Sequence, residues 1–216
     1  MAIGYKVDFH THSDQSFDGG ISADQYRLAL DSDLLDCIAI TDHGSISFAQ
    51  QLHSEYGQRV IVGSEIETTD GDIVGLFLHK PVPSGLRADQ AIRLIREQAG
   101  IVYIPHPFDV LKRGLHPETL EQLADEIDMI EVCDTKRYSK EAVVWARLNH
   151  SRSVVSSNAH HHKQLGNTYT ILSELPTHDN LLSLLPHAKL ITDRSSGLSR
   201  FYNRPARLKQ LFKRKA

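Results

Sequence analysis

Short apolar segments that each end in a metal-binding side chain constrain the fold of this chain more than any other feature. Apolar runs of this length are typical of buried strands, and the longer amphipathic segments between them are typical of helices. Strand and helix alternate about six times, which predicts a parallel sheet with crossover helices. The five runs, each with its terminal ligand group, are Val7–His12, Ile38–His43, Val60–Glu65, Ile101–His106 and Val154–His160.

Ligand groups at the ends of five strands favour a closed barrel over an open sheet. A barrel brings the carboxyl ends of all its strands to one rim, whereas an open doubly wound sheet spreads them along a line. The length of 216 residues suits one substantial domain but is short for eight full strand–helix units. We therefore expect an α/β fold with a small or irregular barrel.

The patterns also predict individual elements. Strands are expected at residues 6–10, 36–41, 59–68, 73–78, 101–104, 129–133, 153–156 and 189–192. Helices are expected after Ser22, which forms a capping box with Gln25, and at 46–56, 88–98, 117–126, 140–149 and 180–185. The Asp70–Gly71 turn predicts that strands 59–68 and 73–78 pair antiparallel.

Composition narrows the class of protein. A formal net charge of −3 gives no overall attraction to nucleic acid or to an anionic membrane. The 13 histidines raise the expectation of metal binding. Cys37 and Cys133 do not make a disulfide framework, and we expect buried free thiols. With no signal peptide and no apolar stretch of roughly 20 residues, the chain reads as a cytoplasmic enzyme without a membrane segment.

The last residues differ from the rest of the chain. Residues 200–216 contain seven Lys and Arg residues and no Asp or Glu. This segment is either a solvated terminal helix or tail, or a basic arm that attracts a polyanionic substrate. We therefore divide the chain into a metal-dependent hydrolase domain at 1–199 and a basic helix or tail at 200–216.

The positions of the candidate ligands along the expected strands indicate how they could bind a metal ion. His10 and His12 are two residues apart on a strand, so both rings face one side and can reach one metal ion. Asp42 is either a ligand or a carboxylate that orients the neighbouring His43. Glu65 ends an apolar strand, where an unpaired carboxylate is costly, and a metal removes that cost.

Taken in order, these motifs resemble the PHP family, the polymerase and histidinol phosphatase domain. The resemblance covers roughly residues 5–195, and Leu165–Thr170 is similar to the segment after the last motif in that family. The motifs that carry it are His10-x-His12, Asp18-Gly19, Thr41-Asp42-His43, Gly63-x-Glu65, His106-Pro107 and Ala159-His160. It implies a distorted (β/α)7 TIM-like barrel with up to three divalent metals, and phosphoester hydrolysis.

The resemblance also implies roles for single residues. His10 and His12 would hold a first metal, with Glu65 as a bridging ligand. A second metal would be held by Asp18, His43 and His160, and His106 would belong to a third site. Asn158 stands where the family usually has an aspartate, and Asp72 where it often has a histidine. We expect two or three manganese, iron or zinc ions, with Asn158 as a weaker ligand.

The expected chemistry is attack on phosphorus by a hydroxide that two ions share. Ions about 3.5–4 Å apart lower the pKa of the water that gives this hydroxide toward neutrality and clamp the phosphate oxygens. We expect Glu65, His43 and Arg113 to be the catalytic residues. Other cations that could neutralise the phosphoryl charge are Lys136, Arg137 and Arg194, and each, like Arg113, could equally be a solvated loop charge. His161 and His162 are either general acids or surface residues.

The substrate is expected to be a small phosphorylated metabolite, a nucleotide or a short oligonucleotide, and no obligate protein partner can be read from the sequence. Two alternatives stay open. An amidohydrolase-like barrel also begins with His-x-His but typically needs a bridging lysine, which no strand end here offers. The second alternative is a non-catalytic metal-binding module, because Asn158 and Asp72 depart from the family pattern.

Overall fold

The computed structural model describes residues 4–133 and 139–192. The strands of this part of the chain are β1 (Tyr5–Thr11), β2 (Cys37–Ile40), β3 (Val60–Thr68), β4 (Gly71–Leu76), β5 (Ile101–Ile104), β6 (Met129–Cys133), β7 (Arg152–Val155), β8 (Thr168–Leu172) and β9 (Lys189–Thr192). They form one sheet in the order β7-β6-β5-β4-β3-β2-β1-β8-β9. Every strand expected from the sequence is present, with ends that differ by two residues at most.

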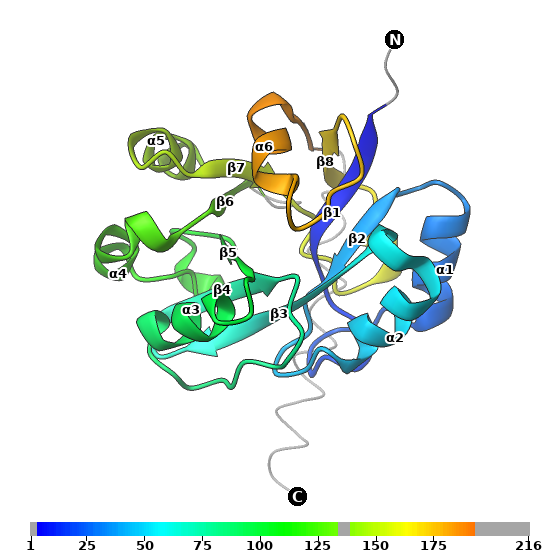
Figure 1. Cartoon of the computed structure of the whole chain (residues 1–216), viewed down its shortest axis with the longest axis horizontal. Helices are drawn as coiled ribbons and strands as arrows, with labels where there is room; N and C mark the ends of the chain where they lie inside the picture. Colours follow the sequence, from blue (N-terminus) through cyan, green and yellow to red (C-terminus); the bar gives the residue numbers. More distant parts are fainter. Residues whose placement is uncertain (1–3, 134–138, 193–216) are drawn as a thin grey trace, which may run out of the picture.

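The expected helices are also present in the described part. They are α1 (Ala23–Asp31), α2 (Ser47–Tyr56), α3 (Ala88–Arg96), α4 (Pro117–Gln122), α5 (Lys140–Leu148) and α6 (Leu181–Leu184), joined by the short 3-10 helices η1 (Gly57–Arg59), η2 (Val110–Lys112), η3 (Ala124–Glu126), η4 (His162–Gln164) and η5 (Leu185–His187). The capping box is confirmed, because the Ser22 side chain accepts from the Gln25 backbone and Gln25 Oε1 accepts from Ser22 N. Helices α1 to α5 lie outside the strands (Figure 1).

The sheet is mixed, which corrects the expectation of a parallel one. Strands β1, β2 and β3 are parallel, and so are β5, β6 and β7. Between these two groups β4 runs antiparallel to both neighbours, as the Asp70–Gly71 turn predicts for β3 and β4. Strands β8 and β9 are antiparallel as well. The sequence did not indicate β8, since its half-buried side chains alternate with buried threonines instead of forming an apolar run.

The sheet nearly closes on itself. A parallel bridge joins Thr11, at the end of β1, to Ala159, just after β7, and His12 N donates to Ala159 O at 2.8 Å. On the next strand Thr170 Oγ1 accepts from Val155 N at 3.2 Å and donates to Val155 O at 3.0 Å. These contacts complete a barrel-shaped sheet. The expected distorted TIM-like (β/α) barrel is therefore confirmed as the fold.

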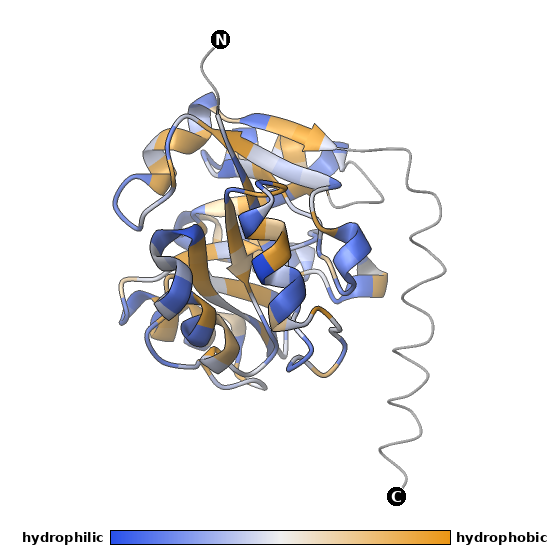
Figure 2. Ribbon diagram, turned by 90° about the vertical axis from the view of Figure 1, so that its right-hand side faces the viewer, coloured by the Kyte–Doolittle hydropathy of each residue, from blue (hydrophilic) through white to orange (hydrophobic). Residues whose placement is uncertain are grey.

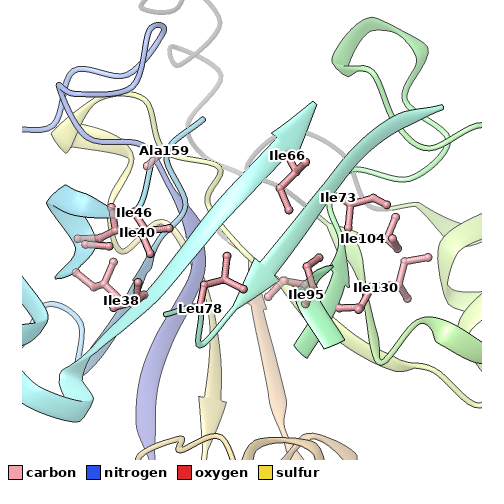
Figure 3. Packing of buried hydrophobic residues seen from close by; sticks show 14 of the residues in the cluster. Ile38, Ile40, Ile46, Ile66, Ile73, Leu78, Ile95, Ile104, Ile130 and Ala159 are labelled. Atoms are coloured by element: carbon pink, nitrogen blue, oxygen red, sulfur yellow. The ribbon is translucent and has the colours of Figure 1, made fainter. Parts of the chain in front are cut away.

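Apolar side chains fill both faces of this sheet. The outer cluster lies between strands and helices and includes Ile38, Ile66 and Ile130 (Figure 3). The inner cluster includes Val7 and Phe9 of β1 and is closed at one end by leucines of α6 and η5. In Figure 2 the strands inside are largely hydrophobic, and the helices around them carry both hydrophilic and hydrophobic residues. The opposite end of the barrel is left for polar groups.

Two of the three remaining expectations can be compared with the described residues. Cys37 and Cys133 are buried thiols that are not joined in a disulfide, as predicted. None of the helices in residues 4–133 and 139–192 combines the length and apolar character needed to cross a bilayer. The basic segment 200–216 lies outside the described residues, so its role stays a prediction.

Candidate metal centre

A β-bulge in β1 turns His10 and His12 toward the barrel interior. Between Asp8 and Thr11 the chain advances three residues while the paired strand β2 advances two. One extra residue in a strand reverses the face that the following residues present. After the bulge both rings lie beside Glu65, with 5.0 Å between their centroids. The spacing predicted that the two rings face one way, and the bulge decides that they face inward.

The Glu65 carboxylate lies at the centre of the site and contacts four of the candidate ligands. Its Oε2 atom lies 3.0 Å from His10 Nε2, 3.1 Å from His12 Nε2 and 3.4 Å from His43 Nε2. Its Oε1 atom lies 3.0 Å from His106 Nε2. Four histidines at the ends of three different strands, β1, β2 and β5, therefore surround one buried carboxylate.

The ligand atoms fall into three overlapping groups. In each group they lie within 4.8 Å of one another, and the groups are His10, Glu65 and His106; His12, His43 and Glu65; and His12, Asp18 and His160. This division differs from the one that the resemblance implied, because His10 is grouped with His106 and not with His12. His12 is shared by two groups, since it stands between Glu65 on one side and Asp18 on the other.

The loop after β1 brings Asp18 to the centre. Asp18 Oδ1 lies 3.7 Å from His43 Nε2, and its Oδ2 lies 3.4 Å from His160 Nδ1. The loop passes so close to β1 that a Cβ atom at Gly19 would lie 2.9 Å from the Cβ of His12. Only glycine fits there, which explains why the Asp-Gly pair is needed to place the carboxylate.

Asp42 supports this loop. Its carboxylate accepts hydrogen bonds from Ser13 N at 2.7 Å and from Ser13 Oγ at 2.5 Å, and its backbone carbonyl accepts from Ser64 Oγ at 2.8 Å. Burial raises the pKa of Asp42. Of the two roles considered for Asp42, the contacts favour the orienting one, because they tie the loop that carries Asp18 to the strand end that carries His43.

The electrostatics of the cluster favour the metal-binding forms of Glu65 and His160 but not that of His43. Burial alone would raise the pKa of Glu65, but His10 and His43 hold it well below its usual value. Burial alone would lower the pKa of His43, but Glu65 and Asp18 raise it to about 9. Burial lowers the pKa of His160 well below its usual value. An ionised carboxylate and a neutral imidazole are the forms that bind metal, and a bound cation would displace the proton that His43 holds in its absence.

Glu131 of β6 is a buried acid of this site that the sequence analysis did not single out. Its Oε2 accepts from His106 N at 2.7 Å, its Oε1 accepts from Tyr103 OH at 2.8 Å, and Oε1 lies 3.9 Å from His10 Nδ1. Glu131 thus fixes the backbone of one ligand and lies beside the ring of another. The signal that could have revealed it is an acid within an apolar strand, the same signal that marked Glu65.

Asp8 is a second buried acid beneath the cluster. Its Oδ1 accepts from Ser157 N at 2.9 Å, which joins β1 to the segment after β7. Burial, together with the nearby Glu131 carboxylate, raises the pKa of Asp8 to about 7. Asp8 lies in the first apolar run, Val7–His12, where the sequence indicated only the two histidines as ligands, and its bond to Ser157 helps to close the barrel two residues before His10.

Asn158 lies next to the residue that bridges β1. Its backbone has a φ of +47°, and its Oδ1 atom is buried with no hydrogen-bond partner among the described residues. A buried amide oxygen without a donor is costly unless a ligand satisfies it. This orphaned atom supports Asn158 as a weak neutral ligand, although its role as a ligand stays a prediction.

The remaining candidates make other contacts, and among the described residues neither His161 nor His162 belongs to the three ligand groups. Arg113 forms an ion pair with Asp72, 3.1 Å from Nε to Oδ1. His161 Nδ1 accepts from Lys163 N, and the exposed His162 lies 3.1 Å from Gln25 Nε2, so neither histidine gains support as a general acid. The cations Lys136, Arg137 and Arg194 lie outside the described residues.

The cluster fits divalent cations. The Nε2 atoms of His10 and His12 lie 3.0 Å from each other and at nearly the same distance from one Glu65 oxygen. Each imidazole nitrogen is either an N–H donor or a lone-pair acceptor. The two nitrogens and the oxygen therefore cannot form good hydrogen bonds in all three pairs at once. A cation between them would satisfy all three. Imidazole and carboxylate together suit zinc, iron and manganese.

Comparisons of sequence find two uncharacterized relatives in Methanocaldococcus jannaschii. One is 34% identical over 113 residues, which are 51% of this chain and 63% of the relative. The other is 32% identical over 123 residues, which are 53% of this chain and 52% of the relative. The matched part thus spans about half to two thirds of these curated relatives. No protein-family model matches the chain.

Comparisons of structure find barrels of the same shape. A two-domain protein from Bacteroides vulgatus, described as containing a predicted PHP-like metal-dependent phosphoesterase, has a TM-score of 0.66 at 21% identity, over 88% of this chain and 65% of that one. PsfC from Pseudomonas syringae has a TM-score of 0.69 at 16% identity, over 93% and 98%. Endonuclease Q, bound to a duplex with an abasic lesion, has 0.66 at 14%, over 87% and 58%. The chain therefore shares its distorted TIM-like barrel with these proteins.

Proposed function

We propose that this chain is a metal-dependent phosphoesterase of the PHP type. The observation that carries the proposal is the convergence of His10, His12, His43 and His106 on the carboxylate of Glu65 at one end of a barrel. Structural neighbours with this barrel are described as a predicted metal-dependent phosphoesterase and as a DNA endonuclease, which supports phosphoester chemistry. The substrate is a phosphomonoester or phosphodiester of a small metabolite, a nucleotide or a short oligonucleotide.

The protein's own groups have separate tasks in this proposal. Glu65 Oε2 lies within 3.4 Å of the Nε2 atoms of His10, His12 and His43, and Oε1 lies 3.0 Å from His106 Nε2, so each carboxylate oxygen would have its own histidines if two ions were bound. Bound manganese, iron or zinc would supply Lewis-acid activation of water and of the phosphate oxygens. Arg113 offers a guanidinium to the phosphate, because its N–H groups match the spacing of phosphate oxygens.

A small cavity beside the cluster suits a compact substrate. It has a volume of about 250 Å³ and is lined by His106 and Glu131, together with Pro107, Phe108, Asp109, Val132, Cys133, Ser139 and Glu141. Carboxylates and a serine alternate with apolar side chains along its wall, as expected for a group that carries hydroxyls or amides. We assign this cavity to the part of the substrate that is esterified to phosphate.

The test is a turnover assay with defined metals. Protein loaded with manganese, iron or zinc is assayed with p-nitrophenyl phosphate, bis(p-nitrophenyl) phosphate and a short oligonucleotide. We expect hydrolysis of at least one substrate, and we expect His12→Ala and Glu65→Ala to abolish it. His178→Ala is the matched control, because this half-exposed ring contacts Asp179 and Phe77 and no member of the cluster. Unchanged turnover in both cluster variants would rule out the mechanism.

The same experiment separates the two alternatives. In an amidohydrolase-like site the bridging group is typically a lysine, whereas Glu65 stands between the rings here, so amide substrates are expected to remain intact. A non-catalytic metal-binding module would show less than one equivalent of tightly held metal and no turnover. Metal content is therefore measured on each protein before the assay.

A further inference from the structure

Asp72 stands where the resemblance led us to consider a metal ligand, but its side chain forms an ion pair with an arginine. Its side chain is 4% exposed, and its Oδ1 accepts from Arg113 Nε at 3.1 Å. Arg113 Nη2 donates to Thr68 O at 2.9 Å. These two bonds hold the guanidinium from one side. Asp72 is also absent from the three groups of ligand atoms found among the described residues.

Backbone contacts clamp the β3–β4 turn to the loop that carries Arg113. Asp72 N donates to Arg113 O at 2.8 Å, and His116 N donates to Asp70 O at 2.8 Å. Gly71 between these contacts has a φ of +124°, and a Cβ there would lie 2.7 Å from the carbonyl oxygen of Gly114. Only glycine allows so close an approach in that conformation. The turn and the loop therefore form one rigid unit around the guanidinium.

The register of β3 and β4 directs this unit toward the metal centre. Glu65 pairs with Val74, and Glu67 pairs with Asp72. Paired residues of antiparallel strands share a face, so Asp72 is the diagonal neighbour of Glu65 on the inner face, roughly 7–8 Å away. Burial and the negative charge of Glu65 raise the pKa of Asp72 to about 7, which fits this proximity. The guanidinium adds a positive charge at this rim of the centre.

Part of the guanidinium remains available to a ligand. The group has five N–H donors, and its bonds to described residues, Asp72 and Thr68, use two of them. The Arg113 side chain is 55% exposed, although its anchor is buried. A planar donor group that is fixed on one edge and open on the other is suited to two oxygens of a phosphate.

We propose that Asp72 is a positioning residue, which holds Arg113 at the rim of the metal centre so that the guanidinium binds the phosphate of the substrate. Asp72 is then no metal ligand. This inference rests on the proposed function for its ligand, and it adds the residue that fixes the cation. Gly71 and Thr68 belong to the same arrangement. Gly71 lets the turn approach the loop closely, and the Thr68 carbonyl accepts a hydrogen bond from Arg113.

The test measures phosphate binding and metal content separately. Metal-loaded wild type, Asp72→Asn, Arg113→Ala and the double variant are titrated with inorganic phosphate by calorimetry, and their metal content is determined. Each single variant should retain its metal and bind phosphate about 10–100-fold more weakly, as expected when a charge-assisted hydrogen bond is lost. The double variant should be no weaker than Arg113→Ala, because Asp72 acts through that side chain. Arg87→Ala, which removes an exposed arginine paired with Asp89, should leave phosphate affinity unchanged.

The outcomes are distinct. Loss of metal in Asp72→Asn, or effects that multiply in the double variant, would overturn the positioning role. Coupled effects on phosphate affinity without any turnover by the wild type would refute the proposed function and leave the positioning role standing. Turnover by the wild type with unchanged phosphate affinity in Asp72→Asn would support the proposed function and refute the positioning role. If Asp72→Asn does not fold, Asp72→Glu keeps the charge, displaces the guanidinium and should weaken phosphate binding in the same way.

Discussion

The Nε2 atoms of His10 and His12 lie 3.0 Å apart at the end of one strand, and both touch the same oxygen of Glu65. Such closeness of two imidazole nitrogens follows from the bulge in β1, which turns both rings inward. Their neighbourhoods nevertheless differ. His10 shares a ligand group with His106, whereas His12 belongs to two groups and stacks on His160 with 4.4 Å between ring centroids.

This difference predicts unequal effects of two substitutions. His12→Ala removes a ligand atom from two groups, and His106→Ala removes one from a single group. We expect His12→Ala to weaken metal affinity about tenfold more than His106→Ala does, a difference of about 1.4 kcal/mol. Metal titration followed by calorimetry measures both affinities, and His178→Ala serves as the control. Equal losses in the two variants would show that the ions do not share His12.

Metal removal should destabilise the barrel measurably. A cation that binds only the folded chain at a hundredfold excess over its Kd stabilises it by about 2.7 kcal/mol. For a domain of this size that corresponds to a rise in Tm of roughly 5–10 °C. Thermal unfolding with and without a chelator checks the shift. Glu65→Ala should abolish the response to metal, and a response that survives in this variant would place the ion elsewhere.

Much of the fold and part of the site could be predicted from the sequence, because both depend on local patterns. The apolar runs marked the strands, and their terminal side chains marked His10, His43, Glu65 and His106 as neighbours. Strand β8 was missed because threonines alternate along it, which is typical of a half-buried strand and also of a loop. Ring orientation depends on a bulge that no local signal in β1 reveals.

Contacts between distant segments were harder to foresee. The sequence placed Arg113 seven residues after His106 and Asp72 at the β3–β4 turn, but nothing in either segment indicates that they meet. Their contact depends on how the turn packs against the loop after β5, which is a property of the folded barrel. The support that Asp42 gives to Ser13 is tertiary in the same sense.

Glu131 offers a test of the residues that support the ligands. Glu131→Gln leaves the size of the side chain unchanged but weakens its bond to His106 N and its interaction with the ring of His10. We expect a loss of about 1–3 kcal/mol in the free energy of unfolding of the metal-free protein. Metal affinity should fall roughly 10–100-fold, as for other groups that orient a ligand.

Tyr103→Phe is the matched variant for this test. It removes one donor to Glu131 and leaves the bond to His106 N in place. Its effect on metal affinity should therefore be smaller than that of Glu131→Gln. Denaturant unfolding and metal titration measure the two quantities, and a larger effect of Tyr103→Phe would mean that Glu131 does not act through the histidines.

Cys37 reports on the integrity of the barrel interior. Its thiol is buried among inner-cluster residues such as Phe9 and Ala39, and burial raises its pKa well above the ordinary value. Because the thiolate is the reactive form, labelling at pH 8 should require unfolding and should rise with the population of unfolded protein. The measurement is alkylation of the Cys133→Ser variant, followed by mass spectrometry at increasing denaturant. Complete labelling in native buffer within minutes would show that the interior of the barrel opens freely, contrary to the packing around Cys37.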